Sequence, residues 1–271
     1  MSDIVLSSGV RSNLLNLQQT SDLISSTQNK LATGKRVNSA LDNPINYFTA
    51  QGLTVRANDL NALLDTMSTG INTIQAANNG ITAITKLVQT AQSLVTQAQQ
   101  TSDTTVRAAL ATQFDSIRSQ IDQLAGDAGI NGVNLLNGNS LTITLNETGT
   151  STVTIAGVND TCANALAING SANNWASATD IGVSATQLTT ALTTLRSQSQ
   201  ALSSNLQTVQ IRQDFTKAMV NTLNTGADSL TLADSNEEGA NLLALQTRQQ
   251  LSTTALSLAA QADQNVLRLF Q

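Results

Sequence analysis

The sequence contains no histidine, a single cysteine (Cys162), a single proline (Pro44) and few aromatic side chains: one Trp, one Tyr and four Phe. Large aromatic residues normally anchor the core of a globular domain, so their scarcity argues against a compact fold with a thick interior. A rod whose interior is one side chain deep needs only Leu, Ile, Val and Ala. The lone cysteine excludes an internal disulfide framework and does not fix the compartment.

Charge is also scarce, with 13 Lys and Arg against 18 Asp and Glu. This mildly acidic balance argues against a nucleic-acid surface and against electrostatic binding to anionic lipid. Long apolar runs are missing too: IVL at 4–6 is the longest in the first thirty residues, and nothing approaches the roughly twenty residues of a membrane span. We therefore expect no membrane insertion and no Sec-type signal, and either a cytoplasmic location or export by a route that reads another feature.

What the sequence does have is a seven-residue repeat of apolar side chains, held over two long stretches. Such a repeat predicts long helices packed side by side with a left-handed supercoil. At 1.5 Å per residue the two stretches would be about 55 and about 65 Å long. About half of the companion positions are polar, which favours a bundle or filament over a tight two-stranded zipper. The predicted seam consists of Leu60, Met67, Ile74, Ile81, Val88, Val95, Leu188, Leu195, Leu202, Val209 and Leu223.

Both ends of the chain show weaker helical patterns. The C-terminal stretch carries leucines on more than one face, and such a helix requires more than one partner. Neither end has enough apolar surface to offset the entropy lost on ordering it, so we expect both to be disordered in the monomer and buried among neighbouring copies. The residues expected at these contacts are Leu14, Leu17, Ile24, Leu31, Leu242, Leu245, Leu256, Val266, Leu269 and Phe270.

The middle of the chain differs from its flanks. Residues 104–125 predict a further helix, with Ser102 or Asp103 as its N-cap. Residues 140–158 alternate apolar and polar side chains around a turn, which predicts a β-hairpin. Residues 159–182 show no period and predict a loop or a small variable cap. The predicted fold is mainly α: a long antiparallel helical rod or coiled coil from both termini, with the hairpin and cap at its far tip.

Four stretches, in the expected order, resemble bacterial flagellin. They are LATGKRVNSALDNPINYFTAQGL (31–53), INGVNLLNG (130–138), the hairpin strands LTITL and VTI, and ADSNEEGANLLALQTRQQLSTTALSLAAQADQNVLRLF (233–270). The resemblance covers residues 1–158 and 183–271 and leaves only the stretch between them unmatched.

The resemblance implies a structural subunit that polymerises into the flagellar filament for swimming motility. In the family, both terminal helices pair as a coiled coil lining a central channel, and the long helices make a surrounding tube. The implied divisions are a terminal domain (1–43 with 232–271), a rod domain (44–158 with 183–231) and a surface cap (159–182).

The family also implies where the protein acts and with what. It is expected in the extracellular filament, exported through the flagellar type III route without a cleaved signal peptide. Besides copies of itself, the expected partners are the export apparatus, an export chaperone, the filament cap and the hook-junction proteins.

Two features depart from the family pattern. A short stretch at 159–182 stands where many relatives carry large outer domains, which predicts a thin outer layer. In LVQTAQSLVTQ (87–97), Gln89, Ala91 and Gln92 stand where enterobacterial-type relatives have an Arg, Arg and Glu patch read by a vertebrate Toll-like receptor. The chain is therefore expected to escape that receptor.

Two alternatives remain open. The hook–filament junction protein shares the terminal architecture, and an exported helical-bundle adhesin or effector belongs to another class. We expect no enzyme activity, cofactor or metal site. Cys162 lacks a histidine base anywhere in the chain, and the pair Glu237–Glu238 lacks a second ligand cluster. Lys35–Arg36 is better explained as a solvated helix end or a contact between subunits than as a binding patch.

Overall fold

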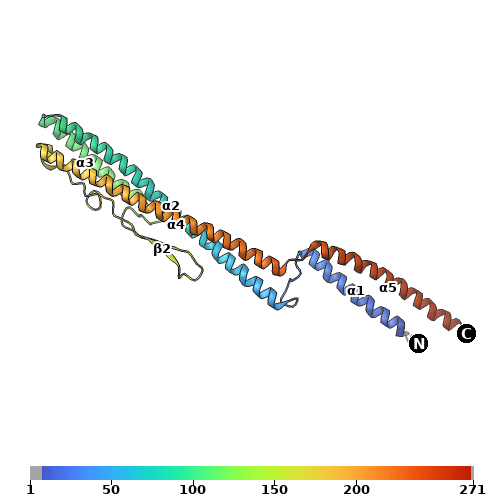
Figure 1. Ribbon diagram of the computed structural model, residues 1–271. Helices are drawn as coiled ribbons and strands as arrows, with labels where there is room; N and C mark the ends of the chain where they lie inside the picture. Colours follow the sequence, from blue (N-terminus) through green and yellow to red (C-terminus); the bar gives the residue numbers. More distant parts are fainter. Residues whose placement is uncertain (1–7, 270–271) are drawn as a thin grey trace. The chain divides into compact units, whose positions relative to one another are not determined.

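The computed structural model describes residues 8–269, apart from the side chains of residues 263 and 266–269. Within this range the chain forms five α-helices, one 3₁₀ turn and a two-stranded sheet, which confirms the predicted mainly α fold (Figure 1). The elements are α1 (Ser8–Thr33), α2 (Pro44–Gln100), α3 (Thr104–Asp127), β1 (Leu141–Thr144), β2 (Thr152–Ile155), η1 (Ala172–Trp175), α4 (Ala178–Thr231) and α5 (Ser235–Leu269).

Packing divides the chain into two units, which are described separately. The terminal unit comprises Met1–Val55 and Thr222–Gln271, and the central unit comprises Arg56–Asn221. Helices α2 and α4 therefore supply residues to both units. The resemblance placed the division at the ends of these helices, whereas packing places it about ten residues inside them.

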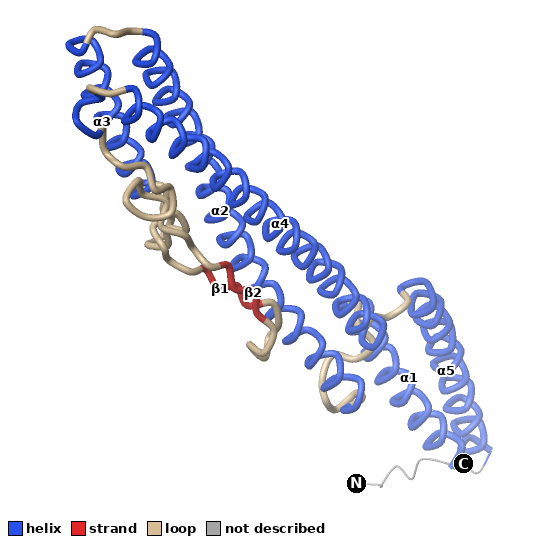
Figure 2. Tube along the Cα trace, turned by 60° about the vertical axis from the view of Figure 1, so that its left-hand side comes forward, coloured by secondary structure: helices blue, strands red, loops and turns tan. Residues whose placement is uncertain are grey.

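The central unit is a bundle in which α2 and α4 lie side by side with α3 (Figures 1 and 2). All eleven predicted seam residues are buried, none of them more than 7% exposed; ten lie in this unit, and Leu223 lies in the terminal unit. Polar side chains of α4 also form hydrogen bonds with polar side chains of α2. Ser199 Oγ donates to Asn78 Oδ1 at 2.7 Å, and Gln213 Nε2 donates to Ser68 Oγ at 2.9 Å. The mixed polar and apolar seam is therefore compatible with helix packing, because these polar side chains bond to one another between α2 and α4.

Helix α3 begins at a capped N-terminus, as predicted. The Asp103 carboxylate accepts from the backbone N–H of Thr105 and Val106, at 2.8 and 3.4 Å. These bonds satisfy two of the donors that a helix start leaves without a partner.

The predicted hairpin is present and packs on α2. Strands β1 and β2 are antiparallel, with Leu141 opposite Ile155. Ile143 and Ile155 are buried, and Ile143 lies against Gly70 of α2 so closely that a Cβ at Gly70 would collide with it. This contact explains a glycine in the interior of a long helix, where it otherwise costs about 0.5–1 kcal/mol relative to alanine. At the turn, Glu147 pairs with Arg56 at 2.7 Å.

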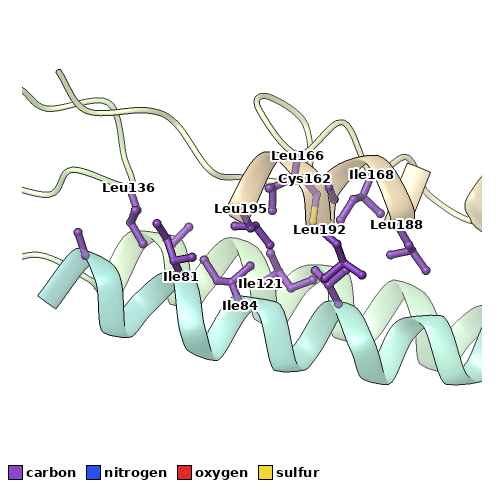
Figure 3. Packing of buried hydrophobic residues seen from close by; sticks show 14 of the residues in the cluster. Ile81, Ile84, Ile121, Leu136, Cys162, Leu166, Ile168, Leu188, Leu192 and Leu195 are labelled. Atoms are coloured by element: carbon purple, nitrogen blue, oxygen red, sulfur yellow. The ribbon is translucent and has the colours of Figure 1, made fainter. Parts of the chain in front are cut away.

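The segment after the hairpin, expected to be a variable cap, contributes to the core of the central unit. Cys162, Leu166, Ile168 and Trp175 are at most 1% exposed, and Figure 3 shows the first three packed with side chains of α3 and α4. Helix α4 begins at Ala178, within the stretch expected to be irregular. The burial of these apolar residues could not be predicted from periodicity, because they follow an irregular backbone and therefore show no period.

Backbone and side-chain hydrogen bonds fix this segment to α3. Cys162 N–H donates to Asp122 Oδ1 at 2.6 Å, and Arg118 Nε donates to Ile168 O at 2.8 Å. Ser171 Oγ donates to Asp115 Oδ2 at 2.6 Å. The polar face of α3 thus holds a segment that has no regular hydrogen bonding of its own.

In the terminal unit, α1 and α5 lie antiparallel and side by side (Figures 1 and 2). Lys30 near the end of α1 pairs with Glu238 near the start of α5 at 3.0 Å. The connection after α1 bonds to the last turn of α4, where Arg36 N–H and Val37 N–H donate to Thr231 O at 2.8 and 3.3 Å. These bonds are one reason why the start of α2 and the end of α4 belong to the terminal unit. Among the described residues, no helix has the length and apolarity needed to cross a membrane.

Candidate assembly surface

The paired terminal helices bury little of their own apolar surface. On α1 only Val10, Thr20 and Thr27 are buried, and two of these are threonines. Among the described side chains of α5, none is buried. A helix pair in water is normally stabilised by burying an apolar stripe on each helix, and here that stripe is largely uncovered.

The predicted contact residues lie at the edge of this pairing. Leu14 is 39% exposed, and Leu17, Ile24 and Leu31 of α1 are half-buried, as are Leu242, Leu245 and Leu256 of α5. Six of the seven described members are therefore half-buried along the α1–α5 seam, whereas Leu14 is exposed. The side chains of Val266 and Leu269, and all of Phe270, lie outside the described residues.

A second apolar face of the same helices points to solvent. Leu243, Leu251 and Leu258 of α5 are 67%, 67% and 62% exposed, and Leu15 of α1 is 60% exposed. Leu23 of α1 is 51% exposed, but it lines a hollow between α1 and α5. The three α5 leucines stand at steps of eight and seven residues, so they share one helix face. The sequence pattern had indicated leucines off the α5 stripe. It missed Leu15 and Leu23, which stand directly beside the seam positions Leu14 and Ile24.

The start of α2 carries another exposed apolar group. Leu41, Ile45 and Phe48 are 96%, 78% and 62% exposed. The ring of Tyr47 stands edge-on to that of Phe48, with 5.5 Å between the ring centres. Ile45 and Phe48 lie three residues apart in α2, and this spacing was a readable signal for a common helix face. Leu41 precedes them in the turn before α2.

The turn before α2 is organised by a carboxylate. Asp42 Oδ2 accepts from the backbone N–H of Asn38 and of Ser39, both at 2.9 Å. These backbone hydrogen bonds, chiefly from Ser39 and Asn38, lower the pKa of Asp42 below its ordinary value because they favour the charged form. At the end of α1, Gly34 has φ of +66°, a left-handed conformation that ends the helix. The turn that presents Leu41 is therefore a defined structure.

Lys30, Glu238 and Arg36 of the terminal unit have structural partners. Lys30 and Glu238 stand in a polar hollow of about 470 Å³ between α1 and α5, with Asn241 and Arg248 in its lining. Arg36 Nη2 donates to Ser229 O at 3.0 Å. Within the described part of the chain, no group of three or more His, Cys, Asp or Glu side chains could hold a metal ion.

Cys162 is held in an unreactive environment in the central unit. Burial, and secondarily the neighbouring Asp122 charge, raise the pKa of the Cys162 thiol to about 12. A thiol with so high a pKa carries almost no thiolate at neutral pH, and the thiolate is the nucleophilic form. This chemistry is the opposite of what a catalytic cysteine requires.

The three residues at the expected receptor patch do not share one surface. Gln89 is exposed and Gln92 is half-buried, whereas Ala91 is 0% exposed in the core of the central unit. Ala91 therefore cannot face a receptor, because it occupies an inward position of α2. The remaining contrast with the enterobacterial-type pattern lies at Gln89 and Gln92.

Comparison with known proteins gives a consistent set of relatives. Residues 9–141 match the family model described as the bacterial flagellin N-terminal helical region. Flagellin FljN of Caulobacter vibrioides is 34% identical over 100% of this chain and 99% of its own length. The flagellin of Brucella melitensis is 26% identical over the full length of both chains. The crystal structure of Bacillus cereus flagellin is 18% identical, with a TM-score of 0.39 over 67% of this chain and 94% of that one.

Proposed function

This chain belongs to the bacterial flagellin family, and from that premise we propose that it is the structural subunit of a flagellar filament whose terminal helices fold as it assembles. Flagellins are structural proteins that polymerise into the extracellular filament. An enzymatic role is therefore not part of the proposal.

One observation supports the coupling between folding and assembly: among the described side chains of the α1–α5 pair Val10 is the only buried apolar one, whereas several leucines are exposed. Leu243, Leu251 and Leu258 lie on a face that the pair itself leaves open, while the described side chains of α5 include no buried one. Burial of a leucine side chain is worth roughly 1.5–3 kcal/mol, so each of these residues would contribute once a neighbouring copy covers it. A segment with this balance is ordered by its partner rather than by itself.

Contacts on more than one face favour an extended polymer over a closed dimer. The α1–α5 pair has a half-buried seam and a separate exposed face on α5, and the start of α2 adds Leu41, Ile45 and Phe48. Different patches on one molecule make head-to-tail contacts with the next, and such contacts produce an open helical polymer when the rotation does not close.

The decisive experiment changes the polarity of the open face. The double variant Leu251→Gln, Leu258→Gln keeps good helix formers at both positions. We expect it to remain a folded monomer with an unchanged thermal transition of the central unit, and to form no filaments when salt-induced assembly is followed by electron microscopy. The matched control, Leu251→Met, Leu258→Met, keeps the face apolar and should assemble. Long filaments from the Gln variant would contradict the proposal.

A truncation tests the same idea without substitution. Removal of residues 252–271 should leave the central unit folded, because the described core of that unit contains none of these residues. The truncated chain should be unable to polymerise. Filaments of the unaltered chain would also separate this function from that of a hook–filament junction protein, which is not expected to form them alone.

The finer assignments rest on family membership. We propose export through the flagellar type III route, with an export chaperone, the filament cap and the hook-junction proteins as partners. We also propose that Gln89 and Gln92 remove the charges that the vertebrate Toll-like receptor reads. Strong activation of a receptor reporter cell line by purified monomer would contradict the last point.

A further inference from the structure

A buried carboxyl group of the central unit has an incomplete set of hydrogen bonds. Asp160, in the irregular segment after the hairpin, is 0% exposed. Its Oδ1 accepts from Gln198 Nε2 of α4 at 2.8 Å. Asp160 Oδ2 and Gln198 Oε1 are also buried, and neither has a hydrogen-bond partner. Such orphaned buried atoms are rare in folded proteins, so this pair requires an explanation.

The chemistry of the two orphaned atoms supplies one. An ionised carboxylate and an amide oxygen can only accept, so the two atoms cannot satisfy each other while Asp160 is charged. A proton on Asp160 Oδ2 makes it a donor to Gln198 Oε1. The acid and the amide then exchange two hydrogen bonds in opposite directions, and no acceptor is left over.

We propose that under mildly acidic conditions Asp160 is a neutral carboxylic acid in the folded protein, doubly hydrogen-bonded to Gln198, and that this pair is a pH-dependent lock between the post-hairpin segment and α4. The lock also reaches the turn before the hairpin, because Asp160 N–H donates to Leu136 O at 2.8 Å. A cavity of about 70 Å³ adjoins the pair, lined mainly by apolar side chains such as Ile81, Ile155 and Leu202. Apolar surroundings disfavour a charge at this position.

Charged groups on the neighbouring elements do not neutralise Asp160. On α3, Asp122 accepts from Cys162 N–H and Arg118 donates to Ile168 O. Lys86 of α2 and Arg196 of α4 are exposed, and no ion pair between described residues includes Asp160. Burial raises the pKa of Asp160 to about 6, against the opposing effect of the Gln198 hydrogen bond.

The direction of the pH effect follows from this pKa. The folded state binds the proton more tightly than the unfolded chain, in which the pKa has its ordinary value of 3.8. The stabilisation is fully present below about pH 4 and is lost as the pH rises through about 6. A difference of about two pKa units corresponds to roughly a hundredfold change in the unfolding equilibrium constant.

The test uses Asp160→Asn in the full-length monomeric chain. An asparagine accepts and donates at the same two positions at every pH, so it keeps the lock closed. Between pH 4.5 and 7.5, which spans most of this change, the unfolding constant of the unaltered protein should rise by roughly 25-fold relative to the variant. The matched control is Asp65→Asn, which replaces an exposed acid on α2. The ratio of its unfolding constant to that of the unaltered protein should stay the same over this pH range.

Infrared spectroscopy provides a readout that is independent of stability. The unaltered protein should show the carbonyl band of a buried neutral carboxylic acid, lost with a midpoint near pH 6. The band should be missing from Asp160→Asn and present in Asp65→Asn. A carboxylate that stays ionised at pH 5, or an Asp160→Asn variant less stable than the unaltered protein at pH 7.5, would overturn the lock. Either result would mean that a buried water or cation satisfies the two oxygens.

Discussion

The central and terminal units are built from the same kind of long, aromatic-poor helix, yet they differ in what they do with their apolar side chains. In the central unit Met67, Ile74, Phe114 and Trp175 are completely buried. In the terminal unit the described side chains of α5 include none that is buried, and Leu243, Leu251 and Leu258 are exposed. The difference is that the central unit buries its large apolar side chains within a single chain, whereas the terminal unit leaves such side chains exposed, where we propose that further copies bind.

The largest expected contrast comes from a single core aromatic. Trp175 packs on Phe114 with 5.0 Å between ring centres, and its Nε1–H donates to Ser184 Oγ at 3.1 Å. Trp175→Ala should lower the unfolding free energy of the monomer by about 3–5 kcal/mol, because it leaves a large cavity in the core. Circular dichroism during urea unfolding measures the change.

The matched substitution in the terminal unit is Leu251→Ala. Because Leu251 is 67% exposed, its truncation should change the unfolding free energy of the monomer by less than about 0.5 kcal/mol while weakening filament formation. Equal destabilisation of the monomer by the two variants would remove the distinction between the units.

How much of this contrast could be predicted depended on periodicity. The seam of α2 and α4 was readable because Met67, Ile74 and Val88 repeat every seven residues, and a repeat reports a regular helix directly. The leucines off the α5 stripe were readable for the same reason. These leucines were expected to form an open surface because a helix with apolar residues on more than one face requires more than one partner.

The post-hairpin segment could not be predicted in the same way. Cys162, Leu166 and Ile168 are core residues, but their burial depends on an irregular backbone fixed by Asp115, Asp122 and Arg118 of α3. Contacts between a helix face and a distant aperiodic segment leave no local pattern in either stretch. The Asp160–Gln198 pair could not be predicted for the same reason, since its members lie 38 positions apart in the sequence.

Two glycines of α2 allow the packing of the two units to be compared through smaller changes in the free energy of unfolding. A Cβ at Gly70 in the central unit would collide with Ile143, whereas nothing lies within 4 Å of a Cβ built at Gly52 in the terminal unit. Gly70→Ala should therefore destabilise the monomer by about 1–3 kcal/mol through overpacking, despite its better helix propensity. Thermal unfolding followed by circular dichroism measures this.

Gly52→Ala is the control for helix propensity alone. It should be neutral or stabilise by up to about 1 kcal/mol, since alanine favours the helix and meets no neighbour. Combining Gly70→Ala with Ile143→Val, which removes the nearer colliding atom, should recover part of the loss. No recovery would mean that the strain lies elsewhere in the bundle.

The smallest expected effect is a pH response of opposite sign in the two units. The backbone hydrogen bonds to Asp42 lower its pKa, so the stabilisation of the turn before α2 is present above its ordinary value of 3.8 and is lost as the pH falls through the lower folded value. Acidification should thus loosen this turn, whereas it should favour the protonated Asp160–Gln198 pair.

Hydrogen exchange on assembled filaments measures the first effect at the amides of Asn38 and Ser39, after correction for the intrinsic rate. Asp42→Asn should remove the acid dependence at these two amides, and Asp22→Asn, an exposed acid on α1, should preserve it. Exchange that is insensitive to acid in the unaltered filament would show that packing between copies, rather than the carboxylate, fixes the turn.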